Sequence, residues 1–160
     1  MADITIDKLV SGFGRMANDI RAGLLRKAGI AAGLEIRNEA RQRAPRKTST
    51  LVRSIDQDVK KATATEVEIE IGPQVNYGKW IEQGTGLYGP EKKKIVIVPR
   101  RARALRWLNA QGVPVFARRV ESPGMKPRPY LAPAFDARNE DAAQTAMVVI
   151  WAGVERAIPG

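Results

Sequence analysis

A proline-free run from residue 16 to residue 44 constrains the fold more than any other part of the sequence. The run is rich in Ala, Leu, Ile, Arg and Glu, which helices tolerate or favour. Asp7 or Asn18 can cap its start, and Ala44-Pro45 stops it, because the residue before a proline is pushed out of the α region. The sequence therefore predicts one long helix near the amino terminus.

Apolar residues form two neighbouring stripes along this helix. One stripe consists of Met16, Ile20, Leu24, Ala31 and Leu34. The other consists of Leu25, Ala32, Ile36 and Ala40. So wide an apolar arc exceeds what one sheet face normally covers, and it indicates that the second stripe is a subunit interface. A helix buried deep in its own domain fits the pattern equally well, so both readings stay open.

The segments after the helix carry strand patterns. Residues 51–59 read as extended, and residues 66–71 alternate strictly between polar and apolar, so the two predict a hairpin. The β-branched run at 95–98 predicts a further strand, and residues 104–108 and 113–117 predict a second hairpin.

Prolines in residues 122–129 set a stiff connection to a last helix, which begins near Tyr130 and runs to about Ala157. We expect that helix to lie on the sheet through Ala143, Met147, Ile150 and Val154. The predicted fold class is α+β: a long first helix, a mostly antiparallel sheet and a closing helix. We expect one domain over residues 1–160, with a basic hairpin excursion at about 86–128.

Between the two hairpins lies a segment, residues 72–86, in which glycines, two aromatic rings and a carboxylate converge. Its glycine spacing fits no phosphate-binding fingerprint, and no second base stands near Glu82 to make it catalytic. The favoured interpretation is a structural corner with its rings in the core and Glu82 as a polar clasp. The residues of this corner are Tyr77, Trp80, Ile81, Glu82, Gly84 and Thr85.

The composition excludes several classes of function. The chain has no cysteine and no histidine, so disulfides, thiolate metal sites, cysteine nucleophiles and the commonest general base are all missing. We expect no enzyme activity, no metal and no cofactor. No apolar run is long enough to span a membrane and residues 1–5 lack signal-peptide features, so we expect a soluble protein with no membrane partner.

Positive charge is concentrated in one segment. Residues 92–128 hold eleven Lys or Arg and one acid, Glu121, whereas the rest of the chain holds sixteen bases and sixteen acids. This asymmetry predicts a partner-facing role for the segment. The candidate docking residues are Lys92, Lys93, Lys94, Arg100, Arg101, Arg103, Arg118 and Arg119. Trp107 and Phe116 lie among the arginines, which is also typical of nucleic-acid binding, although hairpin core is the preferred reading of both rings.

Four groups of landmarks, in order, resemble the head–tail joining or tail-completion (neck) proteins of long-tailed bacteriophages. The first is Ala44-Pro45 followed by Thr48, Leu51, Ser54 and Ile55. The second is the segment from Tyr77 to Thr85, and the third is Pro99 with Arg100, Arg101, Ala104 and Leu105. The fourth is the proline-rich entry to the last helix, residues 123–134. Together they span about residues 16–157.

The resemblance implies a non-enzymatic virion protein that forms a homo-oligomeric ring, six-fold in this family, at the head–tail junction. Its expected partners are neck or connector proteins and tail-tube or tail-terminator proteins, with non-specific contact to the DNA that passes through. It would assemble in the host cytoplasm. Ser49 stands where the family usually has glycine, so a left-handed backbone there would carry strain. The alternative function is a nucleic-acid-binding protein that uses residues 92–128; a nuclease is a weaker third possibility, because no two-metal carboxylate cluster is readable.

Overall fold

The computed structural model describes residues 6–46 and 49–157, and it divides the chain into two compact units. The first unit comprises Met1–Val75 and Tyr130–Gly160, and the second comprises Asn76–Pro129. The element order is helix, two-stranded hairpin, small irregular unit and helix, so the predicted α+β class is confirmed.

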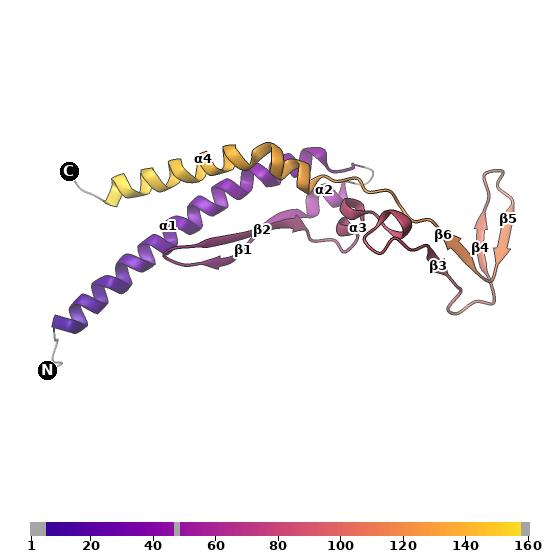
Figure 1. Ribbon diagram of the computed structural model, residues 1–160, viewed down its shortest axis with the longest axis horizontal. Coiled ribbons are helices and arrows are strands. Elements are labelled where there is room, and N and C mark those ends of the chain that lie inside the picture. Colours follow the sequence, from indigo (N-terminus) through magenta and orange to yellow (C-terminus); the bar gives the residue numbers. More distant parts are fainter. Residues whose placement is uncertain (1–5, 47–48, 158–160) are drawn as a thin grey trace. The chain divides into compact units, whose positions relative to one another are not determined.

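Two helices and a hairpin build the first unit. α1 (Ile6–Arg43) runs alongside α4 (Leu131–Ala157), and β1 (Ile55–Ala62) and β2 (Val67–Pro73) both pack on α1 (Figure 1). The long helix begins ten residues earlier than the proline-free run predicted, and it ends one residue before Ala44, as expected. α4 contacts chiefly α1 and reaches the sheet only with its first turns, whose side chains share a hollow with those of β2.

The hairpin of the first unit follows the predicted alternation. β1 and β2 are antiparallel, with Asp58 opposite Glu70 and Val59 opposite Ile69. The acids of both strands are exposed, whereas Val59, Val67, Ile69 and Ile71 are half-buried. One boundary prediction was wrong: residues Thr50–Ser54 form a short helix, α2, and the strand starts at Ile55. Leu51 and Ile55 are both buried, which ties α2 to the core.

Small residues let the packed elements of the first unit approach closely. The core of the described residues is Ala28, Ala40, Ala44, Leu51, Ile55, Tyr130, Ala134 and Ala142. Gly29 and Gly33 also lie buried on α1, and a methyl group at Gly29 would meet Val67 at 2.9 Å. Gly153 on α4 lies against Leu24 in the same way. At these glycines, side chains of the neighbouring element therefore pack directly on the helix backbone.

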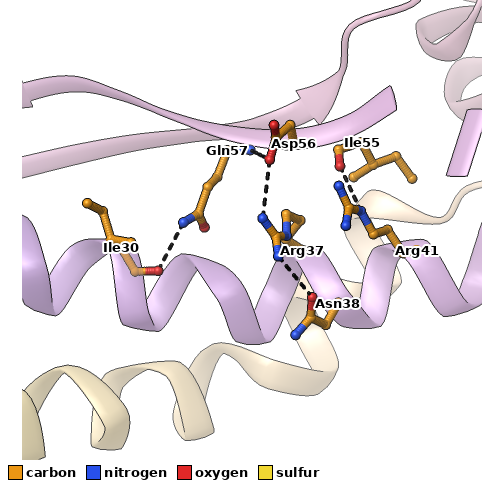
Figure 2. Close-up of polar contacts among 7 residues, drawn as sticks. All are labelled: Ile30, Arg37, Asn38, Arg41, Ile55, Asp56 and Gln57. Carbon is orange, nitrogen blue, oxygen red and sulfur yellow. Dashed lines mark hydrogen bonds and ion pairs between the residues drawn. The ribbon is translucent and has the colours of Figure 1, made fainter. Parts of the chain in front are cut away.

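A set of polar contacts fixes β1 on α1, as Figure 2 shows. Arg37 Nη1 lies 3.2 Å from Asp56 Oδ1, Arg41 Nε donates to the Ile55 carbonyl at 2.8 Å, and Gln57 Nε2 donates to the Ile30 carbonyl at 3.1 Å. The backbone N–H of Gln57 and the Arg37 guanidinium together hold the pKa of Asp56 below its usual value. Because these bonds come from three successive strand residues, they fix the register of β1 along the helix.

The second unit consists of short elements. α3 (Gly78–Gln83) and η1 (Gly86–Tyr88) are single turns of helix. β3 (Ile95–Ile97) pairs with β6 (Val120–Ser122), and β4 (Leu105–Leu108) pairs with β5 (Pro114–Ala117), each pair being antiparallel. The hairpin predicted around Asn109–Gly112 is confirmed, and its turn is closed by Asn109 Oδ1, which accepts from the N–H groups of Gln111 and Val113. β6 was not predicted, because three residues carry too weak a pattern.

Candidate functional site

The glycine corner of the second unit is built by backbone contacts with a proline-rich strap, residues 123–128. Thr85 N donates to the Met125 carbonyl at 2.9 Å, Leu87 N donates to the Pro123 carbonyl at 2.8 Å, and Arg128 N donates to the Ile81 carbonyl at 2.8 Å. These two segments are about forty residues apart in sequence. The strap therefore holds the corner through main-chain hydrogen bonds.

Glycines make this crossing possible. Gly84, Gly86 and Gly124 all have positive φ, at 76°, 66° and 88°. A methyl group at Gly86 would collide with the Pro123 carbonyl oxygen, and one at Gly124 would collide with the Thr85 carbonyl oxygen. Both the backbone conformation and the close approach thus require glycine at these positions.

The predicted aromatic core of the corner is wrong for the isolated chain. Trp80 is 50% exposed and Tyr77 is 37% exposed, whereas Ile81 and Glu82 are half-buried and Gly78 alone is buried in α3. The physical reason is that the corner packs through glycine backbone, so its large side chains are directed outward. The rings of Tyr77 and Trp80 therefore lie on the surface of the corner.

A hollow of about 580 Å³ lies beside the corner within the second unit. Trp80 and Ile95 supply much of its apolar wall, and Lys79, Lys93 and Lys94 supply positive charge. Lys126 lies over the ring of Tyr88, with its Nζ 5.7 Å from the ring centre. Aromatic faces and ammonium groups are thus presented together on this surface.

The second unit buries no side chain among its described residues. The residues classed as buried within Asn76–Pro129 are Gly78, Gly84 and Gly89, none of which carries a side chain. Its exposed apolar residues are Tyr77, Trp80, Leu87, Tyr88, Ile95, Val96, Ile97, Val98, Trp107, Leu108, Val113, Phe116 and Met125. Trp107 (41% exposed) and Phe116 (64% exposed) are not hairpin core, which corrects the preferred reading of these rings. Two isolated two-stranded sheets are at best marginally stable in water, and exposed apolar residues of this kind are typical of interaction sites.

The predicted docking residues of the basic segment are all exposed: Lys92, Lys93, Lys94, Arg100, Arg101, Arg103, Arg118 and Arg119. Glu121, the one acid of the segment, pairs with Arg119 at 2.9 Å and with Lys94 at 3.5 Å, and these two cations hold its pKa below the usual value. Among the described residues, the other six make no ion pair. The structure thus leaves most of the charge available to a partner.

The predicted interface stripe on α1 divides into two parts. Ala40 is fully buried inside the first unit, so its assignment to a subunit interface is wrong. Leu25, Ala32 and Ile36 remain half-buried. Ala32 and Ile36 line an apolar hollow of about 520 Å³, together with residues of β2 and of the first turns of α4.

The structure also shows an apolar surface that the sequence interpretation missed. Met147, Val148 and Trp151 on α4 are 55%, 68% and 61% exposed, and Ile20 on α1 is 58% exposed. The predicted inward face of α4 is therefore wrong at Ala143 and Met147, both exposed, whereas Ile150 and Val154 are half-buried. The buried face carries Ala134 and Ala142 instead, because the smallest side chains let α4 lie close to α1. The sequence signal for this buried face was the helical spacing of the small residues Ala134 and Ala142.

The described residues hold neither an acidic metal site nor a membrane-spanning helix. No group of three or more acidic side chains in this part of the chain is placed to hold a metal ion. Likewise, none of the helices in the part described combines the length and apolar character needed to span a bilayer.

Comparison with known proteins identifies one family. Residues 6–84 match the HK97-gp10-like family, described as "Bacteriophage HK97-gp10, putative tail-component". The matched segment runs from the start of α1 through the hairpin to the glycine corner, and it confirms the resemblance noted from the motifs at the level of a phage tail component. No curated protein and no solved structure matches the chain.

Proposed function

We propose that this chain, whose residues 6–84 match a bacteriophage tail-component family, is a structural virion subunit that forms a six-membered homo-oligomeric ring at the head–tail junction. The ring completes the tail or joins it to the head, and DNA passes through its centre. Its neighbours are neck or connector proteins on one side and tail-tube or tail-terminator proteins on the other. The protein has no catalytic role in this proposal.

One observation carries the proposal: the second unit holds thirteen large apolar residues exposed and no buried side chain among those described. Extensive exposed apolar surface on a protein marks an interaction site more often than a free surface in water. In a ring, contacts with neighbouring subunits cover such surface, and obligate interfaces resemble a domain core divided between chains. The second unit would thus complete its core on assembly.

The charge of the second unit fits protein contacts better than a grip on DNA. Residues 76–129 contain twelve Lys or Arg and three Asp or Glu. Six copies facing the lumen would place tens of positive charges on the passing DNA, and even 6–10 phosphate contacts give strong binding at low salt. A channel that holds its DNA would impede ejection. We therefore assign most of the exposed cations to neighbouring subunits or to acidic surfaces of the adjoining ring, where complementary charge sets register and speeds docking.

The experiment compares assembly with ejection. Arg100, Arg101 and Arg103 are replaced by glutamine in the phage, and the joining of heads to tails and the release of DNA are scored separately. The control replaces the exposed Arg21, Arg26 and Arg53 of the first unit, so that the same charge is lost elsewhere. Loss of joining in the first variant, with normal joining in the control, supports the proposal. Normal joining with altered ejection would place these arginines in the channel instead.

Electron microscopy of the purified protein tests the ring directly. Closed rings, or density at the head–tail junction of virions, support the proposed function. A protein that stays monomeric at assembly concentrations and contributes no density to virions would overturn it.

A second candidate function, nucleic-acid binding, is favoured by the exposure of Trp107 and Phe116 next to Arg106 and Arg118. Bases stack on exposed rings while arginines contact phosphates. Its test is the salt dependence of DNA affinity: a monomer whose affinity falls steeply between 50 and 200 mM salt supports this candidate. Weak binding with a shallow salt dependence argues against it.

A further inference from the structure

The β4–β5 hairpin presents one strongly apolar face. In its register Arg106 is opposite Phe116 and Leu108 is opposite Pro114, so these four side chains share one side of the hairpin. All four are exposed, with Phe116 at 64% and Leu108 at 61%. The face thus combines two large apolar groups with a single cation, and the Asn109 turn holds the hairpin tip closed.

The first unit carries an apolar hollow with one acid, which complements the apolar hairpin face and its one cation. Its walls come from α1 with Ala32 and Ile36, from β2 with Ile69, and from the first turns of α4 with Ala132, Phe135 and Asp136. Its volume is about 520 Å³, and Phe135 at its rim is 53% exposed. Asp136 is the single charged residue of this lining, and it forms no ion pair with the residues described.

We propose that the β4–β5 hairpin of one copy docks in this hollow of a second copy. Phe116 and Leu108 cover the apolar walls, and Arg106 pairs with Asp136. The inference rests on the homo-oligomer of the proposed function and adds to it the two surfaces that meet. It also assigns Ala32 and Ile36 of the predicted interface stripe to the contact.

Charge and symmetry indicate a second copy as the occupant. The hairpin belongs to a unit with a large excess of cations, whereas the one charged residue in the lining of the hollow is an acid, Asp136, which is exposed. The opposite charges of Arg106 and Asp136 beside the apolar contact would orient the docking. Because the two surfaces are different parts of one chain, each copy offers one to the next, which is the head-to-tail contact that closes a ring. DNA is a poor occupant, since the lining is apolar apart from one carboxylate, Asp136, and includes no cation to contact phosphate.

The absence of cysteine from the chain allows a direct test. Two single variants of the full-length protein, Pro114→Cys on the hairpin face and Ala132→Cys in the hollow, are mixed and oxidised. We expect a disulfide-linked dimer of the two different variants. A mixture of Pro114→Cys with Ala143→Cys, an exposed site about three turns further along α4, should not link.

Each alternative has its own outcome in this test. Equal linking of Ala132→Cys and Ala143→Cys, or no linking while rings are still seen by electron microscopy, overturns the docking and leaves the proposed function standing. Efficient linking within single diluted chains that carry both Pro114→Cys and Ala132→Cys, without linking in the mixture, shows instead that the hairpin occupies its own hollow.

Charge reversal provides an independent measurement. Arg106→Asp and Asp136→Arg should each weaken self-association about tenfold or more in sedimentation velocity, and the double variant should recover it. Arg103→Asp combined with Asp136→Arg is the control and should not recover it. Circular dichroism confirms that each variant is folded. Equal recovery in both doubles would show that net charge alone governs association and would contradict the pairing.

Discussion

Thr85 and Met125 are joined by a reciprocal pair of hydrogen bonds: Thr85 N donates to the Met125 carbonyl, and Met125 N donates to Thr85 Oγ1, both at 2.9 Å. One residue lies in the glycine corner and the other in the proline-rich strap. The pair is the centre of the crossing on which the second unit depends, because that unit has no buried side chains of its own among those described.

Gly124→Ala should disrupt this crossing. Its φ is 88° and its added methyl would collide with the Thr85 carbonyl oxygen. Gly112→Ala is the matched control, because Gly112 also has a positive φ, 77°, but nothing lies within 4 Å of the added methyl. Both variants share a backbone cost of about 1–2 kcal/mol. We expect Gly124→Ala to lose clearly more stability, and amide hydrogen exchange at Thr85 and Leu87 to accelerate in that variant alone. Equal effects of the two changes would show that the close approach is unimportant.

Gly29→Ala should destabilise the first unit although alanine favours helix. Its added methyl would lie 2.9 Å and 3.0 Å from the two methyl carbons of Val67, a β-branched side chain with little freedom to rotate. Overpacking of this kind costs about 1–3 kcal/mol, against a helix gain of about 1 kcal/mol. Gly23→Ala, with nothing within 4 Å, should show the gain alone. Urea unfolding measures both changes, and stabilisation by Gly29→Ala would contradict the tight packing of α1 on β2.

Ser49→Gly should stabilise the protein by about 1 kcal/mol. Ser49 has φ 57° and ψ −4°, a left-handed conformation that costs a residue with a Cβ about 1–2 kcal/mol, and glycine avoids this cost at some loss of chain entropy. This confirms the strain expected where the resembling family has glycine. Ser49→Ala keeps the Cβ and should not stabilise. A lower urea midpoint for Ser49→Gly would show that the serine side chain supports the turn.

Glu39 should make the contact between α1 and α4 sensitive to acid. Its carboxylate lies 2.7 Å from Arg43 Nε and 3.1 Å from Arg138 Nε, and these two bonds hold its pKa below the ordinary 4.5. A lowered pKa in the folded state means that the stabilisation is present above pH 4.5 and is lost as the pH falls through the folded-state value. The thermal midpoint of Glu39→Gln should therefore lie below that of the unmodified protein at pH 7, and the difference should shrink on acidification below pH 4.5. A difference that is constant with pH would exclude this role.

The local features of the fold could be predicted from the sequence because they depend on neighbouring residues. The absence of proline predicted α1, Ala44-Pro45 predicted where it ends, and strict alternation of polar and apolar residues predicted β2. Asn109 to Gly112 marked the tight turn of the second hairpin, and the glycines at 84 and 86 marked a corner that needs positive φ. The count of charges likewise located the exposed cations in residues 92–128, whose contact with a partner stays a prediction.

What only the tertiary structure decided is which side chains are covered, because burial depends on segments that approach from far along the chain. The strap at residues 123–128 meets the corner by backbone contacts, so Trp80 is half exposed where its helical spacing with Tyr77 and Ile81 predicted a core. Ala40 is covered completely within the first unit, although its stripe on α1 was as compatible with a subunit contact. The sequence by itself determined the two long helices, the two hairpins and the distribution of charge. The contacts across space determined which apolar side chains are buried and which remain exposed.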